Sequence, residues 1–596
     1  MQILKKLLFL LTSHEKKQAG LLLLMMLIMA LLDMIGVASI LPFIAVLSDV
    51  SIIETNLILK KIFHFSKNFG IQNNEQFIFA LGILVFIALI TSLTFKALTN
   101  YMQMRFVLMR QYSIGKRLMQ KYLYQPYSWF LGRNSADLGK SILSEVSEVV
   151  GTGIKPFLDL IAQIMVATSI ILLLILLDPK LAIIVGFLFG SAYGLFYNIV
   201  RRYLNQLGEK RLESTFFRFK SISEAFGASK EVKVGGFEDI YIQKFSNAAE
   251  DTAKTQAIAG AINLLPRYFL EAIAFGGILL ITLYMMKQSG SINSSLPIIS
   301  LYVFAGYRLM PAVQQIYQSL AKLSFVGPSL DSLYKDIKSL KSITENQNQE
   351  SLPFNKTITL KNVNYNYPNT SRTALKNISL SIPIKSSIGL VGATGSGKTT
   401  TIDIILGLLQ AQKGTLEIDG EIITYKNSRS WQKNIGYVPQ HIYLADDTVA
   451  ANIAFGVKTE DINIQSVEKA SKIANLHDFV TEELPKQYET TVGERGVRLS
   501  GGQRQRIGIA RALYHEPKVL VLDEATSALD NQTEKAVMDA INNLHKNITI
   551  IIIAHRLSTV KKCDKIFLLE KGKINNEGTF KELIEKNENF RIYSNS

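Results

Sequence analysis

The glycine-rich octapeptide GATGSGKT at residues 392–399 most tightly constrains how this 596-residue chain can fold. It follows an apolar run at 387–391 and precedes a stretch typical of a helix. Strand, glycine loop and helix in this order form a phosphate-binding loop, where backbone N–H groups and the helix N-terminus face the phosphate oxygens. A glycine-rich turn without a ligand is the alternative for the motif alone. We expect phosphate or nucleotide contacts from Gly392, Thr394, Gly395, Ser396, Gly397, Lys398, Thr399 and Thr400.

Within this loop two side chains carry the chemistry. Lys398 would reach the β- and γ-phosphates, and the Thr399 hydroxyl would bind Mg²⁺. The sequence therefore predicts that the second half of the chain contains an α/β domain that binds a nucleotide.

Apolar residues make up 48% of the chain and are unevenly distributed. The first half contains runs long enough to cross a bilayer, whereas the second half is typical of a soluble α/β domain. The formal charge of +16 could indicate nucleic acid or an anionic membrane surface, and membrane spans favour the second. A single cysteine, Cys563, excludes a disulfide framework and a multi-cysteine metal site.

Six apolar stretches in the first half are long enough to span a hydrocarbon core of about 30 Å. They are residues 20–47, 77–96, 157–177, 181–200, 268–286 and 296 to about 313. The long loops after the second and fourth stretches are rich in Lys and Arg, which places them, both termini and the second half in the cytoplasm. We expect the spans to continue as helices into these loops.

The fold class that follows is a multidomain membrane protein, with a six-helix α-helical transmembrane domain ahead of an α/β P-loop ATPase domain. The expected boundaries are 1–323 for the transmembrane domain, 324–353 for a polar linker and 354–596 for the nucleotide-binding domain. Residues 1–12 resemble a signal peptide, but their apolar core is short and no small-residue cleavage site follows, so we expect an amphipathic helix on the inner membrane surface. Residues 51–69 have amphipathic spacing and are expected along the outer surface.

Charged residues at membrane depth are functional candidates, since burying them in lipid is costly. Lys96, Arg267 and Arg308 are the cationic candidates for binding an anionic substrate. Alternatively, Lys96 and Arg267 extend to the headgroups, and Arg308 pairs with Asp33 or Glu271. For Asp33 we favour a buried partner or a role in helix packing.

Two further apolar strands in the second half end in chemically useful residues. The strand at 518–522 ends at Asp523, which can hold Mg²⁺, and Glu524, which can polarise a water for in-line attack. A strand that simply ends in an acidic loop is the alternative. The strand at 548–554 ends at His555, which can reach a γ-phosphate from the same sheet edge.

Tyr367 is an aromatic that can stack on a nucleotide base.

The segment at 499–503 opens a helix with a serine and two glycines, which makes a second anion site. One chain thus has two phosphate-binding helix starts but one nucleotide loop. This predicts a homodimer in which each nucleotide lies between one copy's loop and the other copy's helix start. The second site consists of Leu499, Ser500, Gly501, Gly502 and Gln503.

The 499–503 segment resembles the signature sequence of ATP-binding cassette (ABC) proteins. The accompanying motifs occur in the family's order, and the resemblance implies a Walker A loop at 392–399, a Q-loop at Gln440 and a D-loop at Asp530. It also implies ATP and Mg²⁺ as cofactors, with Thr399, Gln440 and Asp523 near the metal. Implied catalytic residues are Glu524, His555 and Gln440, and Tyr367, Asp523 and Asp530 join the nucleotide contacts.

Six spans ahead of one cassette resemble exporter-type half-transporters of the MsbA-like class. That resemblance implies a homodimer closing on two ATP molecules, with short coupling helices near 128–139 and 226–236 acting on Gln440 and Glu494. The stretches 33–43, 266–271, 307–311 and 436–444 are similar to bacterial lipid-linked oligosaccharide flippases (PglK type).

The flippase resemblance implies a polyprenyl-pyrophosphate glycan as cargo in the bacterial inner membrane. Lys96, Arg267 and Arg308 would then hold its pyrophosphate, since guanidinium matches phosphate geometry. The alternatives are export of lipid A-like lipids, hydrophobic drugs or a peptide. A soluble ABC ATPase acting on nucleic acid or ribosomes is disfavoured by the six spans, so we expect no nucleic-acid partner.

Overall fold

The computed structural model describes residues 2–591 except 69, 178, 290–295, 341–349, 369–372, 494–495, 527, 545–546, 555 and 588–589. The chain forms two compact units. The first comprises residues 1–125 and 133–343, and the second comprises residues 126–132 and 344–596.

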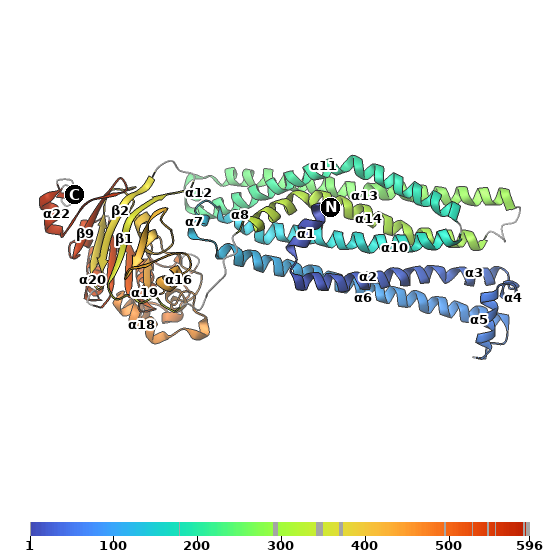
Figure 1. Ribbon diagram of the computed structural model, residues 1–596, viewed down its shortest axis with the longest axis horizontal. Helices are drawn as coiled ribbons and strands as arrows, with labels where there is room; N and C mark the ends of the chain where they lie inside the picture. The colour runs from blue at the N-terminus through green and yellow to red at the C-terminus, as the bar shows by residue number, and fades with distance from the viewer. Residues whose placement is uncertain are drawn as a thin grey trace. The chain divides into compact units, whose positions relative to one another are not determined.

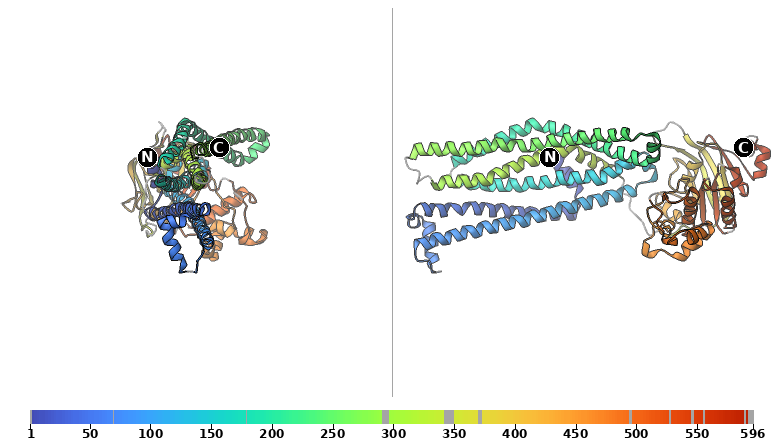
Figure 2. Two further views of the ribbon diagram at one scale, coloured as in Figure 1. Left: turned by 90° about the vertical axis from the view of Figure 1, so that its right-hand side faces the viewer. Right: turned by 180° about the vertical axis from the view of Figure 1, so that it is seen from behind.

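Long helices build the first unit (Figure 1). Helices α2 and α6 lie side by side in Figures 1 and 2, while α10, α11, α13 and α14 pack against one another. Helices satisfy every backbone hydrogen bond internally, which is why apolar sequences in lipid adopt them. The long helices are α2 (Ser13–Ala38), α6 (Asn74–Leu123), α10 (Lys155–Leu177), α11 (Pro179–Gly227), α13 (Glu238–Ser289) and α14 (Leu296–Ser339), and the short α3 (Ile40–Ser48) extends the span that begins with α2.

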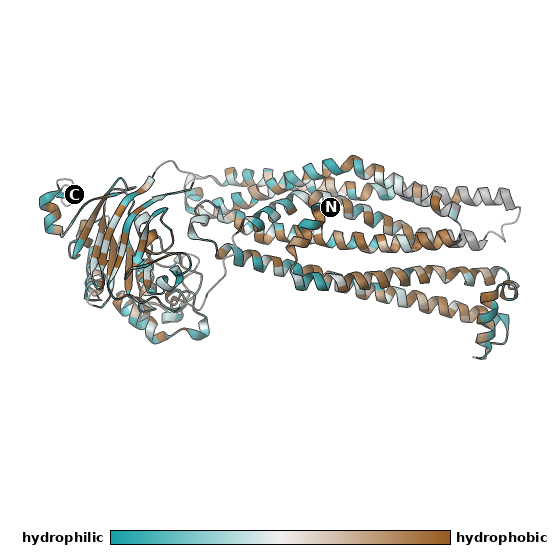
Figure 3. Ribbon diagram, viewed as in Figure 1, coloured by the Kyte–Doolittle hydropathy of each residue, from teal (hydrophilic) through white to brown (hydrophobic). Residues whose placement is uncertain are grey.

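Three stretches of the described residues are long and apolar enough to cross a membrane: Ser13–Leu47, Asn74–Leu123 and Ser135–Leu176. Figure 3 shows the apolar residues along α2, α6 and α10. The other three predicted spans lie on α11, α13 and α14, where parts of the side chains fall outside the described residues. The first span is interrupted at Ser39, whose hydroxyl donates to Gly36 O at 2.9 Å. The predicted continuation of spans as longer helices is confirmed by α6 and α11.

Shorter elements lie between the long helices. The helices α7 and α12 occur where the coupling segments were predicted, and α1 is the predicted N-terminal amphipathic helix. Leu7 and Leu10 of α1 are buried, and Phe9 meets Tyr334 of α14 edge-on. The shorter elements are α1 (Gln2–Leu10), α4 (Ile52–Thr55), α5 (Leu57–Lys67), α7 (Tyr127–Phe130), α8 (Ser135–Lys140), the π-helix Ser141–Glu145, α9 (Val146–Glu148), the π-helix Val149–Ile154 and α12 (Ser229–Gly235).

The predicted linker at 324–353 is wrong in its first part, because α14 continues to Ser339. Val326, Ser329 and Leu330 of this part are fully buried. Their spacing puts them on one helix face, where burial outweighs the polar composition on which the prediction rested. The later part of the predicted linker, 341–349, lies outside the described residues.

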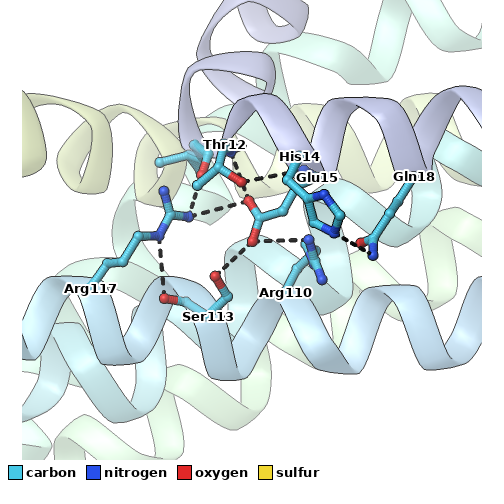
Figure 4. A network of polar contacts seen from close by, with 8 residues as sticks. Thr12, His14, Glu15, Gln18, Arg110, Ser113 and Arg117 are labelled. Atoms are coloured by element: carbon cyan, nitrogen blue, oxygen red, sulfur yellow. Dashed lines mark hydrogen bonds and ion pairs between the residues drawn. The ribbon is translucent and has the colours of Figure 1, made fainter.

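A buried polar network joins the start of α2 to α6 (Figure 4). Glu15 closes a capping box with Thr12 and accepts a hydrogen bond of 2.6 Å from the Ser113 hydroxyl. The same carboxylate lies 2.9 Å from the Arg110 guanidinium, and both side chains are buried. Arg117 donates to Leu10 O at 2.6 Å, which ties the end of α1 into the network.

Replacing Glu15 with Gln is expected to lower stability by about 3 kcal/mol, because Arg110 would become a buried charge without its counterion. Gln can still cap α2, so the loss reports the ion pair. The thermal unfolding midpoint of the purified protein in detergent measures it. Lys16→Gln, an exposed neighbour, serves as the control. An unchanged midpoint for Glu15→Gln would contradict the assignment.

The second unit contains two sheets. A six-stranded sheet has the order β10-β9-β3-β8-β7-β6, in which the strands from β9 to β6 are parallel and the edge strand β10 is antiparallel to β9. Every residue of β3, β7 and β8 is buried, as expected for parallel strands covered on both faces. Its strands are β3 (Ser387–Val391), β6 (Ile435–Val438), β7 (Val519–Asp523), β8 (Thr549–Ile553), β9 (Lys565–Glu570) and β10 (Lys573–Gly578).

An antiparallel sheet with the order β2-β1-β4-β5 completes the unit, together with short helices. Its strands are β1 (Thr357–Asn366), β2 (Thr373–Pro383), β4 (Lys413–Ile418) and β5 (Glu421–Ile422). The helices are α15 (Lys398–Ile405), α16 (Ser428–Gln432), α17 (Val449–Ile453), α18 (Ile464–Ile473), α19 (Gly501–Leu513), α20 (Asn531–Leu544), α21 (Leu557–Val560) and α22 (Phe580–Lys586).

The register of the parallel strands determines which residues lie together at the edge of the six-stranded sheet. Asp523 at the end of β7 pairs with Ile553 at the end of β8, and Leu390 of β3 pairs with the same Ile553. The carboxyl ends of the three strands therefore meet at one edge of the sheet, where α/β proteins bind ligands.

Candidate nucleotide-binding and catalytic site

The loop between β3 and α15 has the backbone of a phosphate cradle. Gly392, Gly395 and Gly397 all have positive φ angles, of 155°, 76° and 105°. A Cβ on Gly392 would approach Leu569 O to 2.2 Å, and one on Gly397 would approach Leu375 Cδ2 to 2.7 Å. Only glycine fits these two positions, so the loop can wrap closely around an anion.

Lys398 begins α15 and is buried against its own loop. Its Nζ donates to Gly392 O at 2.6 Å and to Ala393 O at 3.2 Å. Burial lowers the pKa of Lys398, and the charges of Glu524 and Asp523 oppose that shift. The Ser396 hydroxyl is buried and has no hydrogen-bond partner among the residues that the structure describes. A phosphate oxygen is the kind of acceptor that this donor set lacks, so the loop fits the predicted nucleotide.

The two carboxylates of the predicted catalytic edge have different surroundings. Asp523 is buried, with the Tyr437 hydroxyl donating to it at 3.5 Å, while Glu524 is half-exposed. The Gln440 amide donates to Glu524 at 2.7 Å, although 84 residues separate them. The structure therefore brings Gln440 and Glu524 together, as the motifs predicted.

Glu524 also has an unusual backbone. Its φ is 51°, and its N–H donates to Ile553 O at 3.2 Å, which fixes the turn at the end of β7. Glu524 shares this left-handed conformation with several other described non-glycine residues at turns.

Asp403 is a buried carboxylate that the sequence analysis missed. It lies on α15, and burial together with the charge of Asp523 raises its pKa to about 6. An aspartate inside the apolar run after Lys398 was the only signal available in the sequence.

The oxygen ligands expected for Mg²⁺ are present. Thr399 is exposed at the start of α15, and Asp523 lies at the end of β7, at the same edge of the sheet. The described residues contain no group of three His, Cys, Asp or Glu that could hold a metal unaided. A hydroxyl, one carboxylate and nucleotide phosphates suit Mg²⁺, which is usually completed by phosphate and water.

The signature segment forms the helix start that was predicted. Ser500 caps α19 by accepting from Gln503 N, and the Gln503 side chain accepts from Ser500 N at 2.8 Å. A Cβ on Gly501 would lie 3.3 Å from the Ala528 methyl. Gln505, which the sequence analysis missed, accepts a hydrogen bond of 3.0 Å from Ala528 N. The signature helix is thereby attached to the segment that follows the two carboxylates at the end of β7.

Of four other predicted residues, the structure describes Tyr367 and Asp530. The Tyr367 hydroxyl lies 3.0 Å from the Thr400 hydroxyl, and its ring packs edge-on against Tyr365. Asp530 accepts from the N–H groups of Gln532 and Thr533, and these bonds lower its pKa. His555 lies outside the described residues, as does Glu494.

Beside His555 the structure shows an unpredicted ion pair. Arg556 lies 3.1 Å from Glu534, which also accepts a hydrogen bond of 3.0 Å from the Thr526 hydroxyl. Glu534 therefore connects the segment after β7 with the segment after β8. The sequence offered no signal for this pairing.

Two of the three candidate substrate-binding cations are paired with carboxylates. Lys96 lies 3.4 Å from the fully buried Asp33, and Arg267 lies 2.7 Å from Glu271. The Arg308 side chain lies outside the described residues. The prediction of Asp33 as a buried partner is confirmed, and the charge that Lys96 and Arg267 were expected to offer is already balanced locally.

The second unit combines a glycine-rich phosphate loop, two carboxylates at the end of a strand and a capped signature helix. In a chain with membrane-spanning helices, this combination defines the class of ABC transporters. Family models agree: residues 375–527 match "ABC transporter" and residues 38–311 match "ABC transporter transmembrane region". The chain belongs to the ABC transporter family. Its second unit is an ATP-binding ATPase whose hydrolysis is coupled to transport through the membrane.

Curated relatives include two bacterial ATP-dependent lipid A-core flippases. The protein of Cupriavidus metallidurans is 31% identical over 485 residues, covering 79% of each chain. That of Ralstonia nicotianae is 28% identical over 482 residues, covering 80% of each chain. A solved bacterial Atm1-family ABC exporter with ATP bound superposes with a TM-score of 0.78 at 22% identity, covering 97% of each chain, which supports the exporter fold. The lipid-linked oligosaccharide cargo stays a prediction.

Proposed function

We propose that this protein is a homodimeric, ATP-driven flippase of the bacterial inner membrane whose cargo is an amphipathic anionic lipid with a glycan headgroup. The observation that carries the proposal is the gathering of the Lys398 loop, Asp523, Glu524 and Gln440 at one sheet edge, in a chain whose other unit is membrane-spanning.

The residues at this edge of the sheet have different roles in ATP hydrolysis. Lys398 leaves its loop carbonyls for the β- and γ-phosphates, where its positive charge stabilises the transition state. Glu524 accepts the proton of the attacking water, and the Gln440 amide holds that carboxylate in position. Tyr367 stacks on the base, and His555 contacts the γ-phosphate.

Mg²⁺, when bound, neutralises phosphate charge. Thr399, Asp523 and Gln440 would hold it.

The signature helix supports a dimer. Its capped start is a second anion site within the same chain, separate from the phosphate loop. Two copies arranged head to tail would give each nucleotide one loop and one signature helix. Counting subunits of the protein in nanodiscs while measuring ATPase activity tests this, and full activity of a single copy would contradict it.

Two lines of support bear on the cargo. The membrane stretches of the sequence resemble lipid-linked oligosaccharide flippases, and the relatives above are lipid A-core flippases. Both lipids combine phosphate charge, sugars and long apolar chains, and we favour the polyprenyl-pyrophosphate glycan. ATPase stimulation in vesicles, compared between undecaprenyl-pyrophosphate glycan, lipid A and hydrophobic drugs, discriminates among these. Stimulation by drugs alone would reject a lipid cargo.

Replacing both Arg267 and Arg308 with Ala is expected to stop lipid movement, because guanidinium groups at this depth are the residues best suited to phosphate. A headgroup-accessibility assay in vesicles measures translocation. The double variant Arg201→Ala and Arg202→Ala, which removes as much charge from exposed sites, is expected to translocate normally. Undiminished translocation by the first variant would reject the cationic site.

A further inference from the structure

Glu534 lies in the first turn of α20, on the face of the helix that is buried. The buried positions are three and four residues apart, as expected for one side of a helix, and they are Glu534, Val537, Met538 and Ile541. The last three are apolar and belong to the core. A carboxylate contributes little net stability at such a place, because its desolvation offsets what its partners provide. The charge of Glu534 is therefore better explained by the segments that it contacts than by the packing of α20.

The two oxygens of the Glu534 carboxylate have different partners. Oε1 accepts a hydrogen bond of 3.0 Å from the buried Thr526 hydroxyl, and Oε2 lies 3.1 Å from the Arg556 guanidinium. Thr526 follows Glu524 by two residues. Arg556 directly follows His555 in the sequence. One side chain thus contacts both segments that carry residues expected to act on the attacking water and the γ-phosphate.

The residues on either side of His555 each contact another element of the second unit. Ala554 N donates to Leu390 O of β3 at 3.4 Å. Arg556, on the other side, is held by its ion pair with Glu534 of α20. These two contacts restrict the short stretch of backbone between them. Loss of the ion pair is therefore expected to change the position from which residue 555 reaches toward a nucleotide.

The geometry points to Glu534 as a positioning residue for ATP hydrolysis, which acts through Arg556 on the imidazole of His555. The nucleotide is bound by the Lys398 loop on other elements, so Glu534 affects the turnover of bound ATP and leaves its affinity unchanged. The positioning role rests on the γ-phosphate contact proposed for His555 and makes that proposal more specific.

Steady-state ATP hydrolysis by the full-length protein in nanodiscs tests the positioning role. Glu534→Gln removes the ion pair but keeps an amide oxygen that can accept from Thr526. Arg556→Met removes the same pair from its half-exposed side, where folding depends least on it. Each variant is expected to lower kcat about tenfold and to leave KM for ATP within about twofold, the pattern of a contact that matters in the transition state alone.

Two double variants test whether Glu534 acts through Arg556 and His555. Glu534→Gln combined with Arg556→Met is expected to match the kcat of either single variant within about twofold, since both changes remove one contact. Glu534→Gln added to His555→Ala is expected to lower kcat no further, because the group being positioned is already gone. Two independent structural defects would instead multiply their losses to about 100-fold.

A second ion pair that involves α20 provides the control. Asp539 of α20 lies 2.8 Å from Lys562, which follows α21, and both side chains are in contact with solvent. Asp539→Asn removes this pair, which lies further along α20 and contacts neither Thr526 nor Arg556. The variant is expected to hydrolyse ATP with the kcat and KM of the unmodified protein.

The outcomes separate the positioning role from the proposed function. Unchanged kcat in Glu534→Gln or in Arg556→Met, beside a loss in His555→Ala, overturns the positioning role and leaves the γ-phosphate contact standing. Normal turnover by His555→Ala overturns that contact, and the positioning role falls with it. Weaker ATP affinity in Glu534→Gln, a further loss on top of His555→Ala, or an equal loss in Asp539→Asn would show that Glu534 supports the structure of α20 and would also overturn the positioning role.

Discussion

Replacing Glu524 with Gln is expected to lower ATP turnover at least about 100-fold while ATP still binds, the scale at which a positioned general base contributes. The Gln440 amide lies 2.7 Å from this carboxylate, so the variant keeps a hydrogen-bonding group in place and loses the proton acceptor. With hydrolysis blocked, nucleotide accumulates on the protein. Phosphate release and retention of labelled ATP measure the two effects.

The matched control is Glu585→Gln, an exposed glutamate on α22. It carries the same chemical change away from the sheet edge and is expected to hydrolyse ATP normally. Turnover by Glu524→Gln at the unmodified rate would remove Glu524 from the role of base and leave the strand end as an acidic loop.

Replacing Lys398 with Ala is expected to weaken ATP binding by about tenfold to 100-fold, the loss of a hydrogen bond to a charged group. The variant also frees the carbonyls of Gly392 and Ala393, to which Nζ donates, so the glycine loop loses an internal tie. Equilibrium binding of a fluorescent ATP analogue measures the affinity.

Lys581→Ala, exposed on α22, is the control for this change. The two variants of the site differ in kind, since Glu524→Gln retains nucleotide and Lys398→Ala fails to acquire it. Normal affinity in Lys398→Ala would show that backbone N–H groups alone hold the phosphates.

Local patterns made much of the fold predictable. The glycine loop, the buried strands and the helix start at Ser500 are each specified within a few residues, so the sequence predicted them correctly. The short helices α7 and α12 lie near the segments where the resemblance to exporter-type half-transporters placed coupling helices. The linker prediction was wrong in its first part, because the polar composition around Ser329 did not indicate that one face of this helix is buried against residues distant in the sequence.

Contacts between side chains that are distant in the sequence could not be predicted from local sequence patterns. Asp33 and Lys96 are 63 residues apart, and no local pattern indicates that they meet. The same holds for Gln505 with Ala528 and for Glu534 with Arg556. Such contacts depend on helix packing and sheet register, which only the assembled fold determines.

The hydrogen bond from Ala528 N to Gln505 has a kinetic consequence. In the proposed dimer, nucleotide at one site would contact the signature helix of one copy, and a displacement of that helix would reach the backbone beyond Glu524 of the same copy through this bond. The position of Glu524 in each copy would thus depend on whether nucleotide occupies the site that contains the same copy's signature helix. Plots of turnover against ATP concentration should then be sigmoidal, and replacing Gln505 with Leu should make them hyperbolic.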